Sequence, residues 1–325
     1  MPFMRAIRIS EFGGTEKLKL QTKVDIPTPG RDEVLIKVSA AGINPVDTYI
    51  RSGTFSSRPG LPYTPGFDAA GIVEDVGSEV TEFKKGDRVY TLQTVSGAYA
   101  EYTTAKTTYV GHLDEKLTFN QGAAIGIPYC TAVKALHFRD QSRPAETVLI
   151  HGASGAVGIA SVQIAKAYGL RVIGTAGTKE GMDLVEKTGA DLVFNHREEG
   201  YIQAIQDAVG GVDIVLEMLA NVNLEKDLDL INFRGRIMVI GSRRSIKFNP
   251  RVMMSKESTI TGVSAFKATE AEFREMHSLL RAGQRLGWLK PKISKVYPLE
   301  DAGTAQHDVI NNQGTLGKLV LDTTC

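Results

Sequence analysis

Cysteine is scarce in this chain, and so are charge of one sign and long apolar runs. Only Cys130 and Cys325 are cysteines among 325 residues, which excludes a disulfide framework and a zinc site built from four cysteines. Thirty-eight Lys and Arg oppose 37 Asp and Glu, so the net charge of +1 gives no broad electrostatic surface for nucleic acid or anionic membrane. No run approaches the ~20 apolar residues of a membrane span. The N-terminal MPFMRAIRISEF turns polar too early for a secretory signal. We therefore expect a globular, cytoplasmic protein without a membrane partner.

The first third of the chain is rich in short β-type segments. Runs such as EVLIKVSAAGI and DRVYTL alternate partly between apolar and polar residues, and Gly13-Gly14 and Lys85–Asp87 are among the turns that separate them. This pattern is typical of a folded-over, barrel-like β domain. From Asn120 to Phe138 the apolar spacing becomes helical, and Asn120 is the expected N-cap.

From residue 147 onwards, strands and helices alternate. The segments TVLIHG, RVIGTA, DLVFN, DIVLEML and GRIMVIG read as buried strands, each followed or preceded by a helical segment. This order predicts an α/β fold with a doubly wound parallel sheet. We place a Rossmann-type nucleotide-binding domain at 125–265, inserted into a catalytic domain that is formed by 1–124 and 266–325.

The sharpest motif is the glycine loop Gly152–Gly158, which follows a strand and opens a helix. Glycines there let the backbone approach a pyrophosphate, and the helix N-terminus offers free N–H groups and a positive dipole end. The spacing is G-x-x-G-x-x-G rather than G-x-G-x-x-G. A tight turn that binds no ligand is the alternative.

The end of the second strand predicts which dinucleotide binds. NAD-binding folds place an acid about 20 residues beyond the glycine loop, where it bonds the ribose 2′-hydroxyl. Here the segment Thr175–Lys179 has no acid, and Lys179 stands close by. We therefore expect NADPH as the cofactor. The alternative for Lys179 is that it merely begins a solvated helix.

Three further loops follow predicted strands at the same edge of the sheet. They carry His196, Asn221 to Asn223, and Ser242 to Arg244. Ligands bind at the carboxyl ends of strands in open α/β sheets, so His196, Arg243 and Arg244 are candidates for phosphate or ribose contacts. Ordinary solvated loops are the alternative.

Several ordered blocks resemble the medium-chain dehydrogenase/reductase superfamily. The blocks include AGINPVDTYIRSG at 41–53, PYTPGFDAAGIVEDVG at 62–77, HGASGAVG at 151–158, EMLANVNLEKDL at 217–228 and GWLKP at 287–291. The nearest resemblance is to the zinc-free quinone oxidoreductase branch, of the zeta-crystallin type. It implies a GroES-like β-rich catalytic domain beside the Rossmann domain.

The resemblance also excludes the zinc chemistry of related alcohol dehydrogenases. Those enzymes have a cysteine where this chain has Asn44 and a histidine where it has Phe67, and neither residue here supplies a thiolate or imidazole. We therefore expect no metal. Asp68, where the zinc enzymes keep a glutamate, is expected to be a structural hydrogen-bond acceptor, and Cys130 a core residue.

The resemblance implies contacts with the coenzyme at matching positions. The glycine loop would hold the pyrophosphate, Gly177, Lys179 and His196 would surround the adenosine 2′-phosphate, and Tyr49 and Asn44 would lie beside the nicotinamide and substrate. Residues 263–265 match by position more than by identity. The implied cofactor residues are Tyr49, Ser154, Gly155, Ala156, Val157, Gly177, Lys179, His196, Asn223, Ile240, Gly241, Ser242, Arg243, Val263, Ser264 and Ala265.

The expected function is reduction of quinones by NADPH without a metal. The resemblance favours ortho-quinones and one-electron transfer. Tyr49 is the candidate polar group at the substrate, and a packing tyrosine is its alternative. A reductase of α,β-unsaturated carbonyls is the second enzyme hypothesis, with Asn44 or Tyr49 stabilising the enolate oxygen.

Partners other than the substrate follow from the resemblance alone. It implies a homo-oligomer, a dimer or more readily a tetramer, and an exposed edge strand near 258–263 would suit such pairing. It also implies a non-enzymatic alternative, binding of AU-rich RNA or a crystallin-type role, for which the sequence has no aromatic-basic RNA motif.

Overall fold

The computed structural model describes residues 3–311, 314 and 316–324, and its contacts divide the chain into two compact units. Unit 1 comprises Met1–Ile127, Phe273–Leu286 and Pro291–Cys325, and unit 2 comprises Pro128–Glu272 and Gly287–Lys290. The domain limits at 124/125 and 265/266 that the sequence predicts are a separate statement from this division, and they stay predictions. Cys325 lies outside the described residues.

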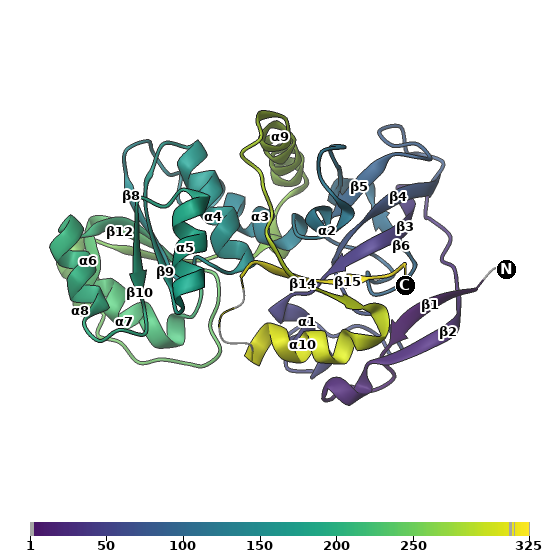
Figure 1. Cartoon of the computed structure of the whole chain (residues 1–325), viewed down its shortest axis with the longest axis horizontal. Helices are drawn as coiled ribbons and strands as arrows, with labels where there is room; N and C mark the ends of the chain where they lie inside the picture. Colours follow the sequence, from purple (N-terminus) through teal and green to yellow (C-terminus); the bar gives the residue numbers. More distant parts are fainter. Residues whose placement is uncertain (1–2, 312–313, 315, 325) are drawn as a thin grey trace. The chain divides into compact units, whose positions relative to one another are not determined.

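Unit 2 is built on a six-stranded parallel sheet (Figure 1). Its strands in spatial order are β10 (Leu192–Asn195), β9 (Arg171–Ala176), β8 (Thr147–Ile150), β11 (Val212–Glu217), β12 (Ile231–Val239) and β13 (Thr259–Gly262). The chain runs outward from β8 to β10, returns to β11 and then continues outward to β13, so the order reverses beside β8. This is the switch point at which open α/β sheets bind ligands.

One helix precedes the first of these strands in the chain, and the others connect successive strands. They are α3 (Gly126–Val133), α4 (Ala156–Ala167), α5 (Lys179–Thr188), α6 (Tyr201–Val209), α7 (Ala220–Leu230) and α8 (Arg251–Lys256). Right-handed crossovers place α4 and α5 on one face and α6 to α8 on the other, in agreement with the packing of α4 on α5 and of α7 on α6 and α8. The apolar side chains of β8, β9 and β11 are fully buried between these layers, and β12 adds Ile231, Ile237 and Met238, whereas its Phe233 is 61% exposed. The predicted α/β fold with a doubly wound parallel sheet is confirmed.

The helical region predicted at 120–138 begins earlier and is divided. The short helix α2 (Phe119–Gly122) starts after Thr118, whose hydroxyl accepts a hydrogen bond from the Gln121 amide at 3.2 Å. Asn120 lies inside α2, so its prediction as the N-cap was wrong. Thr118 and Gln121 form a capping box, in which each side chain bonds to the other residue's backbone amide. The helical pattern therefore cannot begin at Asn120.

Unit 1 is β-rich and contains both ends of the chain. Its larger sheet has the order β14-β15-β3-β4-β5-β7, with β6 paired to β3, and β1 pairs with β2. The bounds are β1 (Phe3–Arg8), β2 (Lys19–Asp25), β3 (Glu33–Gly42), α1 (Pro45–Arg51), β4 (Asp68–Val76), β5 (Arg88–Thr91), β6 (Tyr102–Lys106), β7 (Val110–His112), α9 (Glu270–Leu286), β14 (Ile293–Pro298), α10 (Ala302–Asn311) and β15 (Lys318–Asp322). The last strand, β15, lies antiparallel beside β3 and so brings residues about 280 positions apart into contact.

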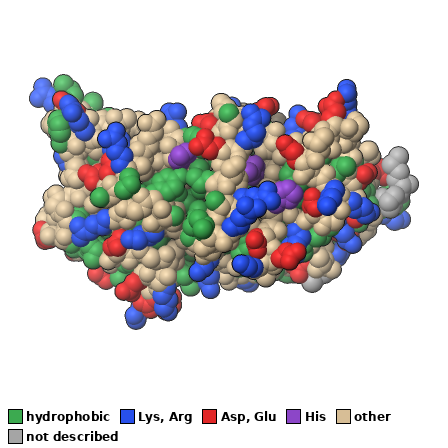
Figure 2. All heavy atoms as spheres, turned by 90° about the horizontal axis from the view of Figure 1, so that it is seen from above, with side chains coloured by type: hydrophobic (Ala, Val, Ile, Leu, Met, Phe, Trp, Pro, Cys, Tyr) green, Lys and Arg blue, Asp and Glu red, His purple; other side chains and the backbone are tan. Residues whose placement is uncertain are grey.

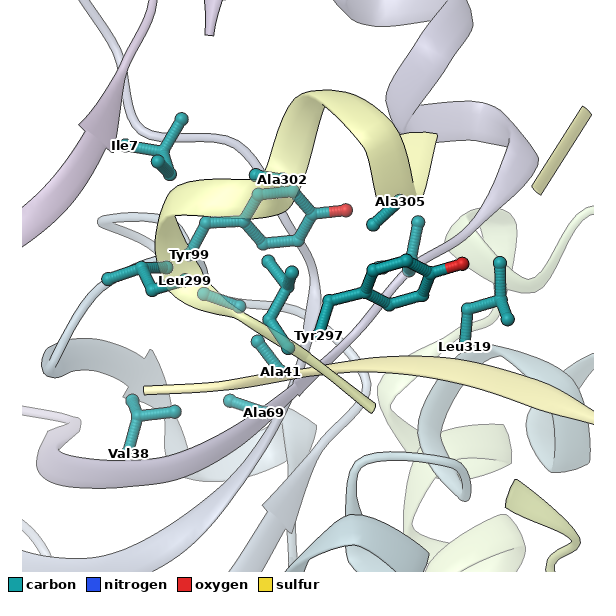
Figure 3. Packing of buried hydrophobic residues seen from close by; sticks show 13 residues of the cluster. Ile7, Val38, Ala41, Ala69, Tyr99, Tyr297, Leu299, Ala302, Ala305 and Leu319 are labelled. Atoms are coloured by element: carbon teal, nitrogen blue, oxygen red, sulfur yellow. The ribbon is translucent and has the colours of Figure 1, made fainter. Parts of the chain in front are cut away.

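A buried cluster ties α10 to this sheet. Figure 3 shows Tyr99 and Tyr297 lying among Ala302 and Ala305 of α10 and aliphatic side chains of the strands. Tyr99 is fully buried and Tyr297 nearly so. The small alanines let α10 approach the two tyrosine rings closely, which fixes the C-terminal segment on the unit.

The surface agrees with the balanced charge of the sequence. On the face drawn in Figure 2, basic and acidic side chains are interspersed. None of the helices in the described residues is long and apolar enough to cross a bilayer. The strand predicted at an edge near 258–263 is β13, which is the outermost strand of the unit 2 sheet. Whether a second copy pairs with it stays a prediction.

Candidate active site

The glycine loop lies between β8 and α4, at the switch point of the unit 2 sheet. Gly152 has a φ of +58°, and Gly155 is the N-cap of the twelve-residue α4. A Cβ added at Gly158 would lie 2.5 Å from the Cα of Ala153, so glycine is required where the helix packs on the loop. The amides of the first turn of α4, with the positive end of its dipole, form an anion-binding cradle. Ser154, Ala156 and Val157 are half-buried around it.

The end of β9 carries a second group of predicted residues. A Cβ at Gly177 would lie 2.7 Å from Nε2 of His196 and 2.8 Å from Nε of Arg197. The structure thus brings Gly177 and His196 together and adds Arg197. Burial lowers the pKa of His196, and the nearby His151 and Arg197 lower it further, so this imidazole is neutral at physiological pH.

Lys179 is the first residue of α5 and is mostly exposed. Its ammonium lies 3.3 Å from Oδ1 of Asp183, four residues along the helix. This contact is an ordinary exposed i, i+4 pair. It keeps the ammonium at the start of α5, within the same edge of the sheet as Gly177.

The loops after β11 and β12 are joined to one another by hydrogen bonds. The Ala220 amide donates to the Gly241 carbonyl at 2.9 Å, and the Arg243 amide donates to Oδ1 of Asn221 at 2.8 Å. Ser242 and Arg243 are exposed, whereas Ile240 and Gly241 are half-buried. These contacts place the segments 218–223 and 240–243 side by side at the carboxyl edge of the sheet.

The remaining predicted residues of unit 2 also lie at this edge. Val263, Ser264 and Ala265 directly follow β13, and the Val263 amide donates to the Val239 carbonyl at 2.9 Å. Only Ala265 of these three is buried. All predicted coenzyme residues of unit 2 therefore follow carboxyl ends of strands of one sheet.

Beneath that edge, three buried titratable side chains meet. Nε2 of His151 lies 2.7 Å from Oδ1 of Asp227 and 3.6 Å from Oε2 of Glu217. The other oxygen of Glu217 accepts hydrogen bonds from the Leu219 amide and from Nδ2 of Asn223. Burial raises the pKa of Glu217 to about 8 and lowers that of His151. We call this set, His151, Glu217 and Asp227, the unit 2 cluster.

In unit 1, the candidate residues Asn44 and Tyr49 belong to one short helix. Asn44 is the N-cap of α1 and is only 3% exposed, and Tyr49 is half-buried one turn further on. The backbone amide of Asn44 donates a hydrogen bond to Oδ2 of Asp47 at 2.8 Å, and the Tyr99 hydroxyl donates to the same oxygen at 2.8 Å. Burial raises the pKa of Asp47 to about 7. Asp47 and Tyr99 thus anchor the start of the helix that carries Tyr49.

The Asn44 side chain is held from the other side by Asp68 and Lys318. Its Nδ2 donates to Oδ2 of Asp68 at 2.9 Å, and the Lys318 ammonium donates to Oδ1 of Asn44 at 2.5 Å and to Oδ2 of Asp68 at 2.8 Å. The Ile127 amide donates to the other oxygen of Asp68 at 2.8 Å. We call Asn44, Asp68 and Lys318 the unit 1 cluster. Asp68 is a structural hydrogen-bond acceptor, as predicted, and all three side chains are buried.

Two family profiles match the chain. The profile described as alcohol dehydrogenase GroES-like domain matches residues 30–115, and the one described as zinc-binding dehydrogenase matches 156–282. The quinone oxidoreductase of Sus scrofa is 56% identical over 320 residues, which cover 98% of this chain and 97% of the relative. The chain belongs to the quinone oxidoreductase family, of the zeta-crystallin type.

Other members of this quinone oxidoreductase family agree in sequence and in structure. The quinone oxidoreductase of Homo sapiens is 54% identical over 98% of this chain and 97% of its own length. The crystal structure of Escherichia coli quinone oxidoreductase complexed with NADPH has a TM-score of 0.87 and 31% identity, covering 98% of this chain and 99% of that one. The GroES-like and Rossmann-type fold is thereby confirmed.

The name of one profile implies zinc, but the unit 1 residues of this quinone oxidoreductase do not fit that ion. Asn44 and Phe67 replace the thiolate and imidazole ligands, and the carboxylate of Asp68 is already paired with a buried ammonium. A divalent cation beside Lys318 would be repelled by it. No step of the chemistry is therefore assigned to zinc at this place.

The sequence analysis did not identify several residues of the two clusters as candidate site residues. His151 and Glu217 end or follow β8 and β11, so the rule that ligands lie at carboxyl edges could have found both. Asp227 and Lys318 gave a weaker signal, a charged residue on the apolar face of a helix or at the start of an apolar strand. Their burial depends on contacts with distant parts of the chain.

Proposed function

We propose that this chain is an NADPH-dependent quinone reductase of the cytoplasm that works without a metal ion. Its curated relatives carry the name quinone oxidoreductase at 53–56% identity over nearly the whole chain. Structures of relatives at about 30% identity, from Escherichia coli and from a mycobacterium, were determined as complexes with NADPH. Ortho-quinones are the favoured substrates within this proposal.

The observation that carries the choice of coenzyme is the chemistry at the end of β9. The segment Thr175–Lys179 has no carboxylate, and its Gly177 faces His196 and the guanidinium of Arg197. A carboxylate there would repel a 2′-phosphate, whereas Arg197 and Lys179 provide positive charge for one. The phosphate is thus proposed to lie over Gly177, where a side chain would leave no room.

The other residues of the edge bind and orient the dinucleotide. The amides at the start of α4 hold the pyrophosphate, and the segments around Asn223, Ile240 to Arg243 and Val263 to Ala265 line the rest of the groove. When bound, NADPH supplies the reducing equivalents from its nicotinamide ring. The protein contributes orientation and a partly dry environment, and quinone carbonyls are electrophilic without further activation.

On the substrate side, the candidate polar groups are Tyr49 and Asn44. Asn44 is held by Asp68 and Lys318, and Asp47 anchors the helix that presents Tyr49. We propose that Tyr49 bonds a substrate oxygen and that Asn44 keeps the local backbone in place. Transfer in one-electron steps is proposed from the resemblance to the family.

The coenzyme choice is tested by titrating NADPH and NADH against wild-type protein and the Lys179→Ala variant. NADPH should bind at least about tenfold more tightly than NADH, and Lys179→Ala should reduce that preference several-fold, because one charge at the 2′-phosphate is removed. Lys187→Ala, at the exposed last turn of the same helix, is the matched control and should behave as wild type. Equal affinity of the wild type for both coenzymes would overturn the coenzyme assignment.

The substrate class is tested by steady-state kinetics with NADPH. Phenanthrenequinone, an ortho-quinone, should have a higher kcat/KM than a simple enone. A much higher value for the enone would favour the α,β-unsaturated carbonyl reductase instead. Two further proposals rest on the family resemblance: a homo-oligomer formed by pairing of β13 edges, and AU-rich RNA as a partner. If RNA binds in the coenzyme groove, saturating NADPH should displace it.

A further inference from the structure

The unit 2 cluster brings two carboxyl groups together in a place that is buried from solvent. His151, Glu217 and Asp227 are 2%, 0% and 0% exposed. With both carboxyl groups ionised and the imidazole neutral, the cluster would hold two buried negative charges. Oε2 of Glu217 and Oδ2 of Asp227 have no hydrogen-bond donor among the described residues. Such charges are strongly unfavourable unless a proton or a cation neutralises them.

The spacing of the cluster favours a proton. The 2.7 Å between Nε2 of His151 and Oδ1 of Asp227 is a hydrogen-bond length. A nitrogen and an oxygen that both bind a tetrahedral divalent ion at its usual bond lengths are separated by about 3.3 Å. One proton between the carboxyl groups of Glu217 and Asp227 would satisfy an oxygen on each and remove one of the two charges.

The groups around the cluster do not neutralise it in another way. Lys226 of α7 is exposed and lies over the ring of Tyr201 of α6, 5.5 Å from its centroid. Tyr201 is uncharged, since burial raises its pKa to about 12. His196, after β10, has a lowered pKa and is neutral as well. Lys226 therefore moderates the field of the cluster from solvent but makes no ion pair with it among the described residues.

We propose that Glu217 is a positioning residue that acts as a neutral carboxylic acid, donating its proton to Asp227 while its other oxygen holds the Leu219 amide and the Asn223 side chain. His151 completes the arrangement by donating from Nε2 to Asp227. This inference rests on the proposed function, because Asn223 and the segment 218–223 line the proposed coenzyme groove. The same segment is bonded to residues 240–243 through Ala220 and Asn221.

The consequence is a coenzyme site that weakens in alkaline solution. When the shared proton is lost, the two carboxylates repel each other, and the segment 218–223 is no longer held in its binding position. If only the protonated form binds, the apparent Kd of NADPH rises by about tenfold for each pH unit above the transition.

The test measures the Kd of NADPH by fluorescence from about pH 7 to about pH 9, a window above the titration of the 2′-phosphate and below that of lysine. Wild-type protein should bind about tenfold more weakly at the alkaline end. Glu217→Gln keeps a donor and an acceptor but cannot lose the proton, so its Kd should change by less than about threefold. Glu225→Gln, at an exposed position of α7, the helix that carries Asp227, is the matched control and should follow wild type.

A second measurement needs no coenzyme and separates this inference from the proposed function. The Tm of wild-type protein should fall more steeply between about pH 6 and about pH 9 than that of Glu217→Gln or of Asp227→Asn, because the folded state retains a proton that the unfolded state has lost. Parallel profiles of Tm and of Kd for wild type and Glu217→Gln would overturn the proposal. So would a stoichiometric divalent metal in the purified wild type that Glu217→Gln lacks. Failure of NADPH to bind the wild type, with the Tm difference intact, would count only against the proposed function.

Discussion

The unit 1 cluster and the unit 2 cluster neutralise their buried carboxyl groups in opposite ways. In the unit 1 cluster, the carboxylate of Asp68 receives a buried ammonium, a side-chain amide and a backbone amide. In the unit 2 cluster, two carboxyl groups share one imidazole, and no Lys or Arg of the described residues pairs with them. One cluster is neutralised by a side chain, and the other needs a proton.

The difference arises because the strand order brings a lysine next to the carboxylate in unit 1 but, among the described residues, not in unit 2. Strand β15 lies next to β3, so Lys318, its first residue, reaches Asp68 at the start of β4. In unit 2, Glu217 ends β11 beside the fully buried apolar residues of that strand, and Lys226 stays in solvent. A lysine keeps its charge across the neutral range, whereas a shared proton does not. The two clusters therefore differ in the group that neutralises them, a fixed side-chain charge in unit 1 and a proton in unit 2.

The largest expected effect is the loss of the buried cation in unit 1. Lys318→Met leaves the Asp68 carboxylate buried without its ion pair and should lower the free energy of unfolding by about 3–5 kcal/mol. Adding Asp68→Asn should restore stability to within about 2 kcal/mol of wild type, since no uncompensated charge then remains. Urea unfolding of the four forms measures the cycle.

The matched control for that cycle is Lys37→Met, at an exposed position of β3 in the same sheet, which should change stability by less than about 0.5 kcal/mol. A double variant as unstable as Lys318→Met alone would show that packing of the lysine chain, and not its charge, is what matters.

The next effect is the pH dependence of stability that Glu217 confers. Its pKa is about 8 in the folded chain and ~4.3 when unfolded, so the folded state binds more protons and stability falls as pH rises between these values. Between about pH 6 and pH 8 this amounts to ~2 kcal/mol. Glu217→Gln should remove this slope in urea unfolding. If Lys318→Met also flattened the slope, the two clusters would not be independent.

The smallest effect compares the two asparagines. Asn44 is buried and both polar ends of its side chain are bonded. Asn223 is half-buried, and within the described part of the chain its side chain makes one hydrogen bond, of 3.3 Å, to Glu217. Asn44→Ala should lower the free energy of unfolding by about 1–3 kcal/mol and Asn223→Ala by about 0.5 kcal/mol. Asn223→Ala should nevertheless weaken NADPH binding more than Asn44→Ala does. Chemical unfolding and NADPH titration together check this, and the reverse order in both would refute the comparison.

Much of the fold could be predicted because its signals are local. The spacing of the apolar residues changes from a period of two to a helical period and then alternates between strand and helix. These changes correspond to the β-rich segment, to the helical region that begins at α2, and to the strands and helices of the unit 2 sheet. The error at Asn120 arose because two residues of similar N-cap quality lie close together, and the partner Gln121 selects Thr118. The glycine loop was also readable, since the requirement for glycine at Gly158 is set by the adjoining Ala153.

The buried clusters could not be predicted in the same way. Asp68 and Lys318 are 250 positions apart, and nothing in the neighbourhood of either residue indicates that they meet. Asp227 sits in a helix whose other charged residues are solvated, so its burial depends on how α7 lies on the sheet.

The sequence by itself determined the order of strands and helices, the glycine loop before α4 and the lack of zinc ligands at Asn44 and Phe67, because these depend on residue type and short spacing. Only the tertiary structure decided which charges are neutralised by partners and which by protons. That outcome depends on desolvation and on distances between strands that are remote in the chain, and both exist only once the sheets have formed.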